Sequence, residues 1–145
     1  MIVPVLMRMA HYCRCEYSKR RGIVTTGVQA IVLTRKDSLV LVRHTYLKGW
    51  HLPGGGAKRG ETPEVAVLRE LKEEIGLISY GEIKSVSCML ESHDDRKVRM
   101  HIFIVTGVTY KFRRSLEIAE TREFDWKSLP ADAGVARSRL GLLNT

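Results

Sequence analysis

One segment in the middle of the chain carries clear signals for the start and the end of a helix. Thr62 can cap the N-terminus, Pro63 suits the first helical position, and Gly76 can end the helix in a left-handed conformation. Together these signals predict one helix over residues 63–75. Both of its ends are therefore defined by the sequence alone.

The expected helix separates apolar from acidic side chains. At roughly 100° per residue, the apolar residues gather on one side and the glutamates gather almost opposite. The apolar side consists of Leu68, Leu71 and Ile75, and the acidic side consists of Glu70, Glu73 and Glu74. We therefore expect one face to join the core and the other to present three carboxylates.

Three carboxylates within about one helical turn repel one another, which costs a few tenths of a kcal/mol per pair on a solvated helix. A bound cation would offset this repulsion, and hard oxygen ligands at this density suit Mg²⁺ or Mn²⁺. The alternative is a solvated acidic face, which is what most glutamate-rich helices present.

The wider pattern favours the cation site. Gly55 is followed by five residues and Glu61, and then by seven residues and the run Arg69-Glu70-Leu71-x-Glu73-Glu74-x-Gly76-Leu77. This stretch resembles the Nudix box without a mismatch, so the chain is similar to Nudix hydrolases. The resemblance implies that Glu70, Glu73, Glu74 and the backbone carbonyl of Gly55 hold Mg²⁺ or Mn²⁺. It also implies that Arg69 and Glu61 pair to brace the loop against the helix.

Outside this segment, apolar and β-branched runs separated by turn residues predict two hairpins. The first pairs residues 27–33 with 38–43, and the second pairs residues 82–91 with 98–108. A short strand over 123–126 and the start of a C-terminal helix over 128–132 follow. Mixed strands with a helix on each side indicate an α/β class fold, an α/β/α sandwich with a mixed β-sheet. The Nudix resemblance implies the same architecture.

The chain has 145 residues, which fits one domain with one core. We expect residues 22–145 to form the Nudix domain and residues 1–21 to form an amphipathic helix and a basic linker. The helix would place in successive turns Val5, Met9, Tyr12 and Cys13 or Glu16. It is expected to pack onto the domain or onto a second subunit, as in a homodimer, with a membrane surface as the alternative.

No stretch of the sequence approaches the ~18 apolar residues of a membrane-spanning helix. The three cysteines are Cys13, Cys15 and Cys88, and they lack a paired metal-binding spacing. Free thiols fit a reducing cytosol better than a secreted domain. The sequence therefore predicts a cytoplasmic protein with no transmembrane segment.

Catalytic residues are assigned by combining the resemblance with the chemistry of phosphoryl transfer. A divalent metal neutralises charge on the phosphate oxygens and lowers the pKa of a bound water. Glu73 or Glu74 could serve as the general base, but some family members use a glutamate beyond the box. The candidates there are Glu117, Glu120 and Glu123, and Glu120 is favoured.

Four residues are expected to contact the substrate: Arg43, Trp50, Gly54 and Gly55. Arg43 ends a strand and resembles a position where the family places a basic residue near the phosphates. Trp50 could stack on a base, although a core position is at least as common. Consecutive glycines let the backbone approach a ligand. His44 and His51 flank this loop, and a structural role is favoured for both.

The strand and loop around residues 42–56 resemble the small bacterial nucleoside triphosphate pyrophosphohydrolases. We therefore expect Mg²⁺-dependent hydrolysis of a nucleoside diphosphate linked to another group, foremost a nucleoside triphosphate cleaved to the monophosphate and pyrophosphate. The net charge of +8 leaves RNA 5′-triphosphate ends open as an alternative substrate. A module that binds nucleotides without hydrolysing them is the third possibility.

Overall fold

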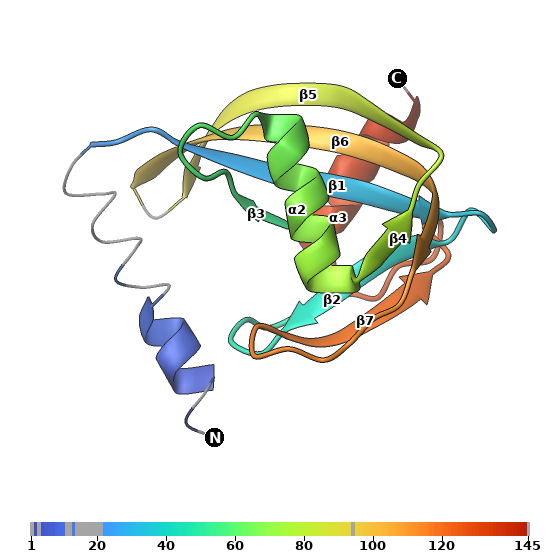
Figure 1. The fold of residues 1–145 in the computed structure, drawn as a ribbon, viewed down its shortest axis with the longest axis horizontal. Helices are drawn as coiled ribbons and strands as arrows, with labels where there is room; N and C mark the ends of the chain where they lie inside the picture. The colour runs from blue at the N-terminus through green and yellow to red at the C-terminus, as the bar shows by residue number, and fades with distance from the viewer. Residues whose placement is uncertain (1, 3, 11–12, 14–21, 94, 145) are drawn as a thin grey trace.

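A computed structural model describes residues 2, 4–10, 13, 22–93 and 95–144, and a seven-stranded mixed sheet forms its centre (Figure 1). The strands are β1 (Thr25–Thr34), β2 (Leu39–His44), β3 (Gly54–Gly56), β4 (Leu77–Ser79), β5 (Glu82–His93), β6 (Arg96–Tyr110) and β7 (Ile118–Phe124). The main order is β4-β6-β1-β2-β7, with β5 beside β6 and β3 beside β1. β1 and β6 run parallel, and the other pairs are antiparallel.

Helices cover both faces of the sheet (Figure 1). α2 (Pro63–Ile75) lies on one face, and α3 (Gly134–Arg139) with the 3₁₀ helix η1 (Leu140–Asn144) lies on the other. Alternate residues of β1 point to opposite faces: Val28, Ala30 and Val32 join the core cluster of α2, and Ile31 and Leu33 join that of α3. The predicted α/β/α sandwich is confirmed.

The predicted central helix is confirmed with the expected ends. Thr62 Oγ1 accepts a hydrogen bond from Val65 N at 3.2 Å, which satisfies one free donor of the first turn. Gly76 ends the helix with a φ of 71°. A Cβ atom there would lie 2.0 Å from the carbonyl oxygen of Lys111, so only glycine fits this position.

Both predicted hairpins are present. β1 and β2 pair through Leu33 and Leu39, and the turn between them contains Asp37 at a φ of 61°. β5 and β6 pair along their length as far as His93 and Arg96. Asp95, in the turn of this second hairpin, also has a positive φ, a conformation that aspartate tolerates better than most residues.

Two predictions near the C-terminus were wrong. The last strand is β7, which begins at Ile118 and not at residue 123 because these residues pair with β2. The last α-helix, α3, begins at Gly134 and not near Ser128. Residues 125–128 instead form a turn in which Ser128 N donates to Asp125 O at 2.9 Å.

The N-terminal segment is described only in part. Ile2, the residues 4–10 and Cys13 are helical. Tyr12, Glu16 and the predicted basic linker lie outside the described residues, so the domain boundary and the homodimer stay predictions. Within the part of the chain that the structure describes, no helix combines the length and apolarity that a membrane span requires.

Candidate active site

The acidic residues of α2 differ sharply in burial. Glu70 and Glu74 are only 9% and 2% exposed, whereas the side chain of Glu73 is 54% exposed. The expectation that all three lie opposite the core was therefore wrong for Glu70 and Glu74. These two residues lie one turn apart on the same face and border the buried side of the helix, where α2 covers the sheet.

The glycine loop meets these buried carboxylates. Gly54 N donates to Glu74 Oε2 at 3.2 Å. A Cβ atom at Gly55 would lie 2.5 Å from Glu70 Oε1, so glycine permits the close approach of the loop to this carboxylate. The structure thus brings together Gly54, Gly55, Glu70 and Glu74, four of the predicted site residues.

Burial makes it costly for the carboxylates of Glu70 and Glu74 to be ionised at the same time. Burial first, and then the negative charge of Glu70, raise the pKa of Glu74 to about 9. Burial also raises the pKa of Glu70. Moreover, Glu74 Oε1 accepts no hydrogen bond from the described residues. A bound cation or an ordered water would satisfy such a buried carboxylate oxygen.

The donor chemistry fits Mg²⁺ or Mn²⁺, because carboxylate and backbone carbonyl oxygens are hard ligands. Among the described residues, no three Asp, Glu, His or Cys side chains already converge as a ready metal site. Arg69 engages two of the carboxylates: its Nη1 donates to Glu70 at 3.0 Å and to Glu73 at 3.2 Å.

Arg69 also fastens the glycine loop to the helix. Its Nε and Nη2 donate to the two oxygens of Glu61 at 2.8 and 3.0 Å, and Nη2 donates to the carbonyl of Gly56 at 3.0 Å. Lys58 N donates to Glu61 as well, at 2.7 Å. The hydrogen bonds from Arg69 and then from Lys58 lower the pKa of Glu61 to about 2. This geometry suits the predicted brace.

The lowered pKa of Glu61 predicts a pH-dependent stability. Its ordinary pKa is 4.5, so its contribution is complete above that pH and is lost as the pH falls toward 2. Glu61→Gln is therefore expected to lower the melting temperature most at pH 6–7, with the difference from the parent shrinking below pH 4.5. Thermal denaturation across this range checks it. A difference in melting temperature that stays constant with pH would show that the ionised Glu61–Arg69 pair does not contribute to stability.

The three glutamates beyond the box lie in different environments. The negative charge of Glu117 contributes to the raised pKa values of Glu70 and Glu74, and its carboxylate accepts a hydrogen bond from Tyr46 Oη at 3.2 Å. Glu120 is held between Arg43 and Arg122. Glu123 accepts from Tyr110 Oη at 3.0 Å. Glu117 is therefore the better candidate for a catalytic carboxylate, because its charge acts on Glu70 and Glu74 whereas Glu120 is paired with two arginines.

Arg43 and Trp50 lie on the face of the sheet that α3 covers. Trp50 is 6% exposed and contacts Phe124 edge to face, with 5.0 Å between the ring centroids. The guanidinium groups of Arg43 and Arg122 lie 5.3 and 5.1 Å from the centroid of its ring. These contacts favour the core role for Trp50 over base stacking. Arg122 carried no signal in the sequence: it lies two residues after Glu120 on the same side of β7, but its position over Trp50 depends on the tertiary fold.

The contact of His51 favours a structural role for this histidine. His51 Nε2 lies 2.7 Å from the carbonyl oxygen of Lys48, within its own loop.

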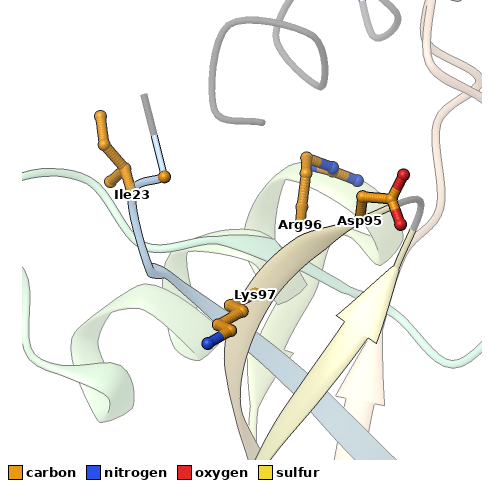
Figure 2. A pocket seen from close by; sticks show the side chains of 5 residues that line it. Ile23, Asp95, Arg96 and Lys97 are labelled. Carbon is orange, nitrogen blue, oxygen red and sulfur yellow. The ribbon is translucent and has the colours of Figure 1, made fainter. Parts of the chain in front are cut away.

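A pocket of about 170 Å³ lies at the tip of the β5–β6 hairpin (Figure 2). Its lining is Gly22, Ile23, Asp95, Arg96 and Lys97, so none of the predicted site residues contributes to it.

Curated proteins are similar to part of this chain. The ADP-ribose pyrophosphatase of Methanocaldococcus jannaschii is 35% identical over 123 residues, which cover 79% of this chain and 71% of that protein. Diphosphoinositol polyphosphate phosphohydrolase 3-alpha of Mus musculus is 33% identical over 93 residues, or 62% of this chain and 56% of that protein. The RNA pyrophosphohydrolase of Hydrogenovibrio crunogenus is 42% identical over 51 residues, or 35% of this chain and 31% of that protein. The matched region thus spans about half the length of the mouse relative and about a third of the RNA pyrophosphohydrolase.

A solved structure shows the same fold. The MutT NUDIX hydrolase from Burkholderia pseudomallei superposes with a TM-score of 0.69 at 20% identity, over 83% of this chain and 97% of that chain. The family model of the NUDIX domain matches residues 24–139, which include every predicted site residue. The chain therefore belongs to the NUDIX domain family.

Proposed function

We propose that the chain hydrolyses a phosphoanhydride, in a reaction that depends on Mg²⁺, with a nucleoside diphosphate linked to another group as the substrate. The observation that carries this proposal is the pair of buried carboxylates, Glu70 and Glu74, beside the close approach of Gly55. The relatives described above are named as pyrophosphatase, phosphohydrolase and pyrophosphohydrolase, which supports the same reaction class.

Glu70, Glu73, Glu74 and the carbonyl of Gly55 would hold the metal. When bound, it would supply charge neutralisation at the phosphate oxygens and a lowered pKa for the attacking water. Arg69 keeps Glu70 and Glu73 in place through its ion pairs. Arg43 pairs with Glu120 and lies over Trp50 on the face of the sheet that α3 covers, so it is not proposed to contact the phosphates at the metal.

Glu117 is proposed as the general base. In this step the water oxygen bonds to phosphorus, the water proton passes to a Glu117 carboxylate oxygen, and the bridging P–O bond breaks. With a nucleoside triphosphate the products are the monophosphate and pyrophosphate. The electrostatic effect of Glu117 on Glu70 and Glu74 supports this choice, and the hydrogen bond from Tyr46 orients its carboxylate.

A comparison of two variants tests the base. Glu117→Gln is expected to lower kcat on the order of 100-fold, the scale of general base catalysis, whereas Glu120→Gln should change kcat less than about 3-fold because its carboxylate faces two arginines. Steady-state kinetics on one substrate measures both. If Glu120→Gln shows the larger loss, the base is Glu120 and not Glu117.

A substrate panel tests the reaction class. Nucleoside triphosphates, ADP-ribose and a 5′-triphosphorylated oligonucleotide are incubated with Mg²⁺, and the products are identified by phosphorus NMR. We expect cleavage of at least one compound at a phosphoanhydride bond, with nucleoside triphosphates giving pyrophosphate. Preferential cleavage of the oligonucleotide would favour the RNA alternative, and binding without cleavage would favour the nucleotide-binding module.

A further inference from the structure

The loop between β6 and β7 is fixed at both of its ends by hydrogen bonds. At its start, Lys111 N donates to the carbonyl of Gly76 at 2.9 Å, next to the end of α2. At its end, Thr45 N donates to the carbonyl of Glu117 at 2.8 Å, and Thr45 Oγ1 donates to that of Leu116 at 2.7 Å. In Figure 1, β7 and the loop before it lie near the C-terminal end of α2 and the end of β2.

This loop carries three exposed cations: Lys111, Arg113 and Arg114. Between them, Phe112 packs against the core cluster of α2, which anchors the loop and leaves its neighbours in solvent. None of the three cations forms an ion pair with a described residue. By contrast, Arg43 and Arg69 each contact a carboxylate.

We propose that Lys111, Arg113 and Arg114, the basic rim, bind phosphate groups of a small substrate beyond the anhydride that is cleaved. This inference rests on the proposed function, because it assigns the substrate class of that site. The glutamates of the site repel a polyanion, so additional phosphates need cations close by. Three uncompensated cations in the loop that also carries Glu117 meet that need, and arginine can bind phosphate through two parallel hydrogen bonds.

The size of the basic rim favours a compact ligand. Arg114 lies three residues from Glu117, so their Cα atoms are at most about 11 Å apart. The rim itself covers only four positions of the chain. This reach suits one or two additional phosphates. A bound RNA strand would instead need contacts to roughly 6–10 successive phosphates to account for tight binding.

Two variants with equal loss of charge test the proposal. The rim variant is Lys111→Ser, Arg113→Ser and Arg114→Ser together. The control variant is Arg35→Ser, Lys36→Ser and Lys84→Ser together, at exposed positions in the β1–β2 turn and on β5 that form no ion pair with a described residue. Calorimetry measures the binding of inorganic tripolyphosphate and of pyrophosphate to the parent and both variants in one Mg²⁺ buffer.

The parent and the control variant are expected to bind tripolyphosphate about 10-fold more tightly than pyrophosphate, the scale of one charged hydrogen bond. The rim variant should lose most of that preference. Equal preference in all three proteins would overturn the proposal. So would a rim variant that loses only thermal stability, because cations near the C-terminal end of α2 also stabilise the helix through its dipole.

The same titrations separate this inference from the proposed function. A parent that hydrolyses no phosphoanhydride contradicts the proposed function. The preference for tripolyphosphate over pyrophosphate still tests whether the basic rim binds phosphate. A 5′-triphosphorylated oligonucleotide provides the remaining comparison. If it binds at least about 100-fold more tightly than tripolyphosphate through the rim, with an affinity that falls on the order of 10³-fold between about 50 and 200 mM salt, the ligand is RNA. That result would overturn the small-substrate assignment.

Discussion

Glu74→Gln is expected to lower the turnover of any hydrolysed substrate at least ~100-fold, the loss seen when a group that stabilises transition-state charge is removed. Glu74 is almost fully buried, contacts the glycine loop through Gly54 N, and has one oxygen with no donor among the described residues. The amide keeps the shape of the side chain but cannot supply a charged oxygen. Glu73→Gln is expected to cause a loss of the same order.

The control for this experiment is Glu64→Gln, an exposed glutamate in the first turn of the same helix. It removes one negative charge from α2 without touching the site, so turnover should stay within about 2-fold of the parent. Circular dichroism checks that all the variants fold. Near-parental rates in both Glu73→Gln and Glu74→Gln would contradict the metal assignment.

Arg69→Ala is expected to lower both stability and activity. The side chain joins Glu61, the carbonyl of Gly56, Glu70 and Glu73, so its loss frees the glycine loop and leaves acidic groups unpaired. We expect a melting temperature lower on the order of 5–10 °C. Turnover should fall about 100-fold, because small misplacements of catalytic groups are costly.

The matched control is Arg59→Ala, since Arg59 is exposed in the same loop and forms no ion pair with a described residue. Its melting temperature and turnover should remain close to those of the parent. An Arg69→Ala variant that is as stable as the parent but inactive would place Arg69 among the substrate contacts. An Arg69→Ala variant that loses stability but keeps full activity would show that Arg69 has only a packing role.

The sequence predicts the fold well where local chemistry marks the boundaries. Thr62, Pro63 and Gly76 define α2 because each favours one backbone conformation. The C-terminal helix has no such marker. Its N-cap is Ala133, which makes no side-chain hydrogen bond, so the helix-start pattern over residues 128–132 misplaced its start. β7 was shortened because Glu120 and Arg122 interrupt the apolar pattern expected of a strand.

The site was predicted less completely than the fold, because its details depend on tertiary contacts. Helical periodicity identified the glutamates of α2 but not the burial of Glu70 and Glu74, which depends on how α2 sits on the sheet. The choice between Glu117 and Glu120 depends on strand pairing, which places Glu120 opposite Arg43. Spacing along the sequence contains no information on either point.

The measurement that tests the central claim most directly is the rate of phosphoanhydride hydrolysis after the metal is removed with EDTA and Mg²⁺ is added back. The claim is that the carboxylates of α2, with the glycine loop, form a metal-dependent hydrolytic site. It predicts no detectable hydrolysis in EDTA, and a saturable recovery with Mg²⁺ in the parent that fails in Glu74→Gln. Hydrolysis that continues unchanged in EDTA, or an equal recovery in both proteins, would contradict it.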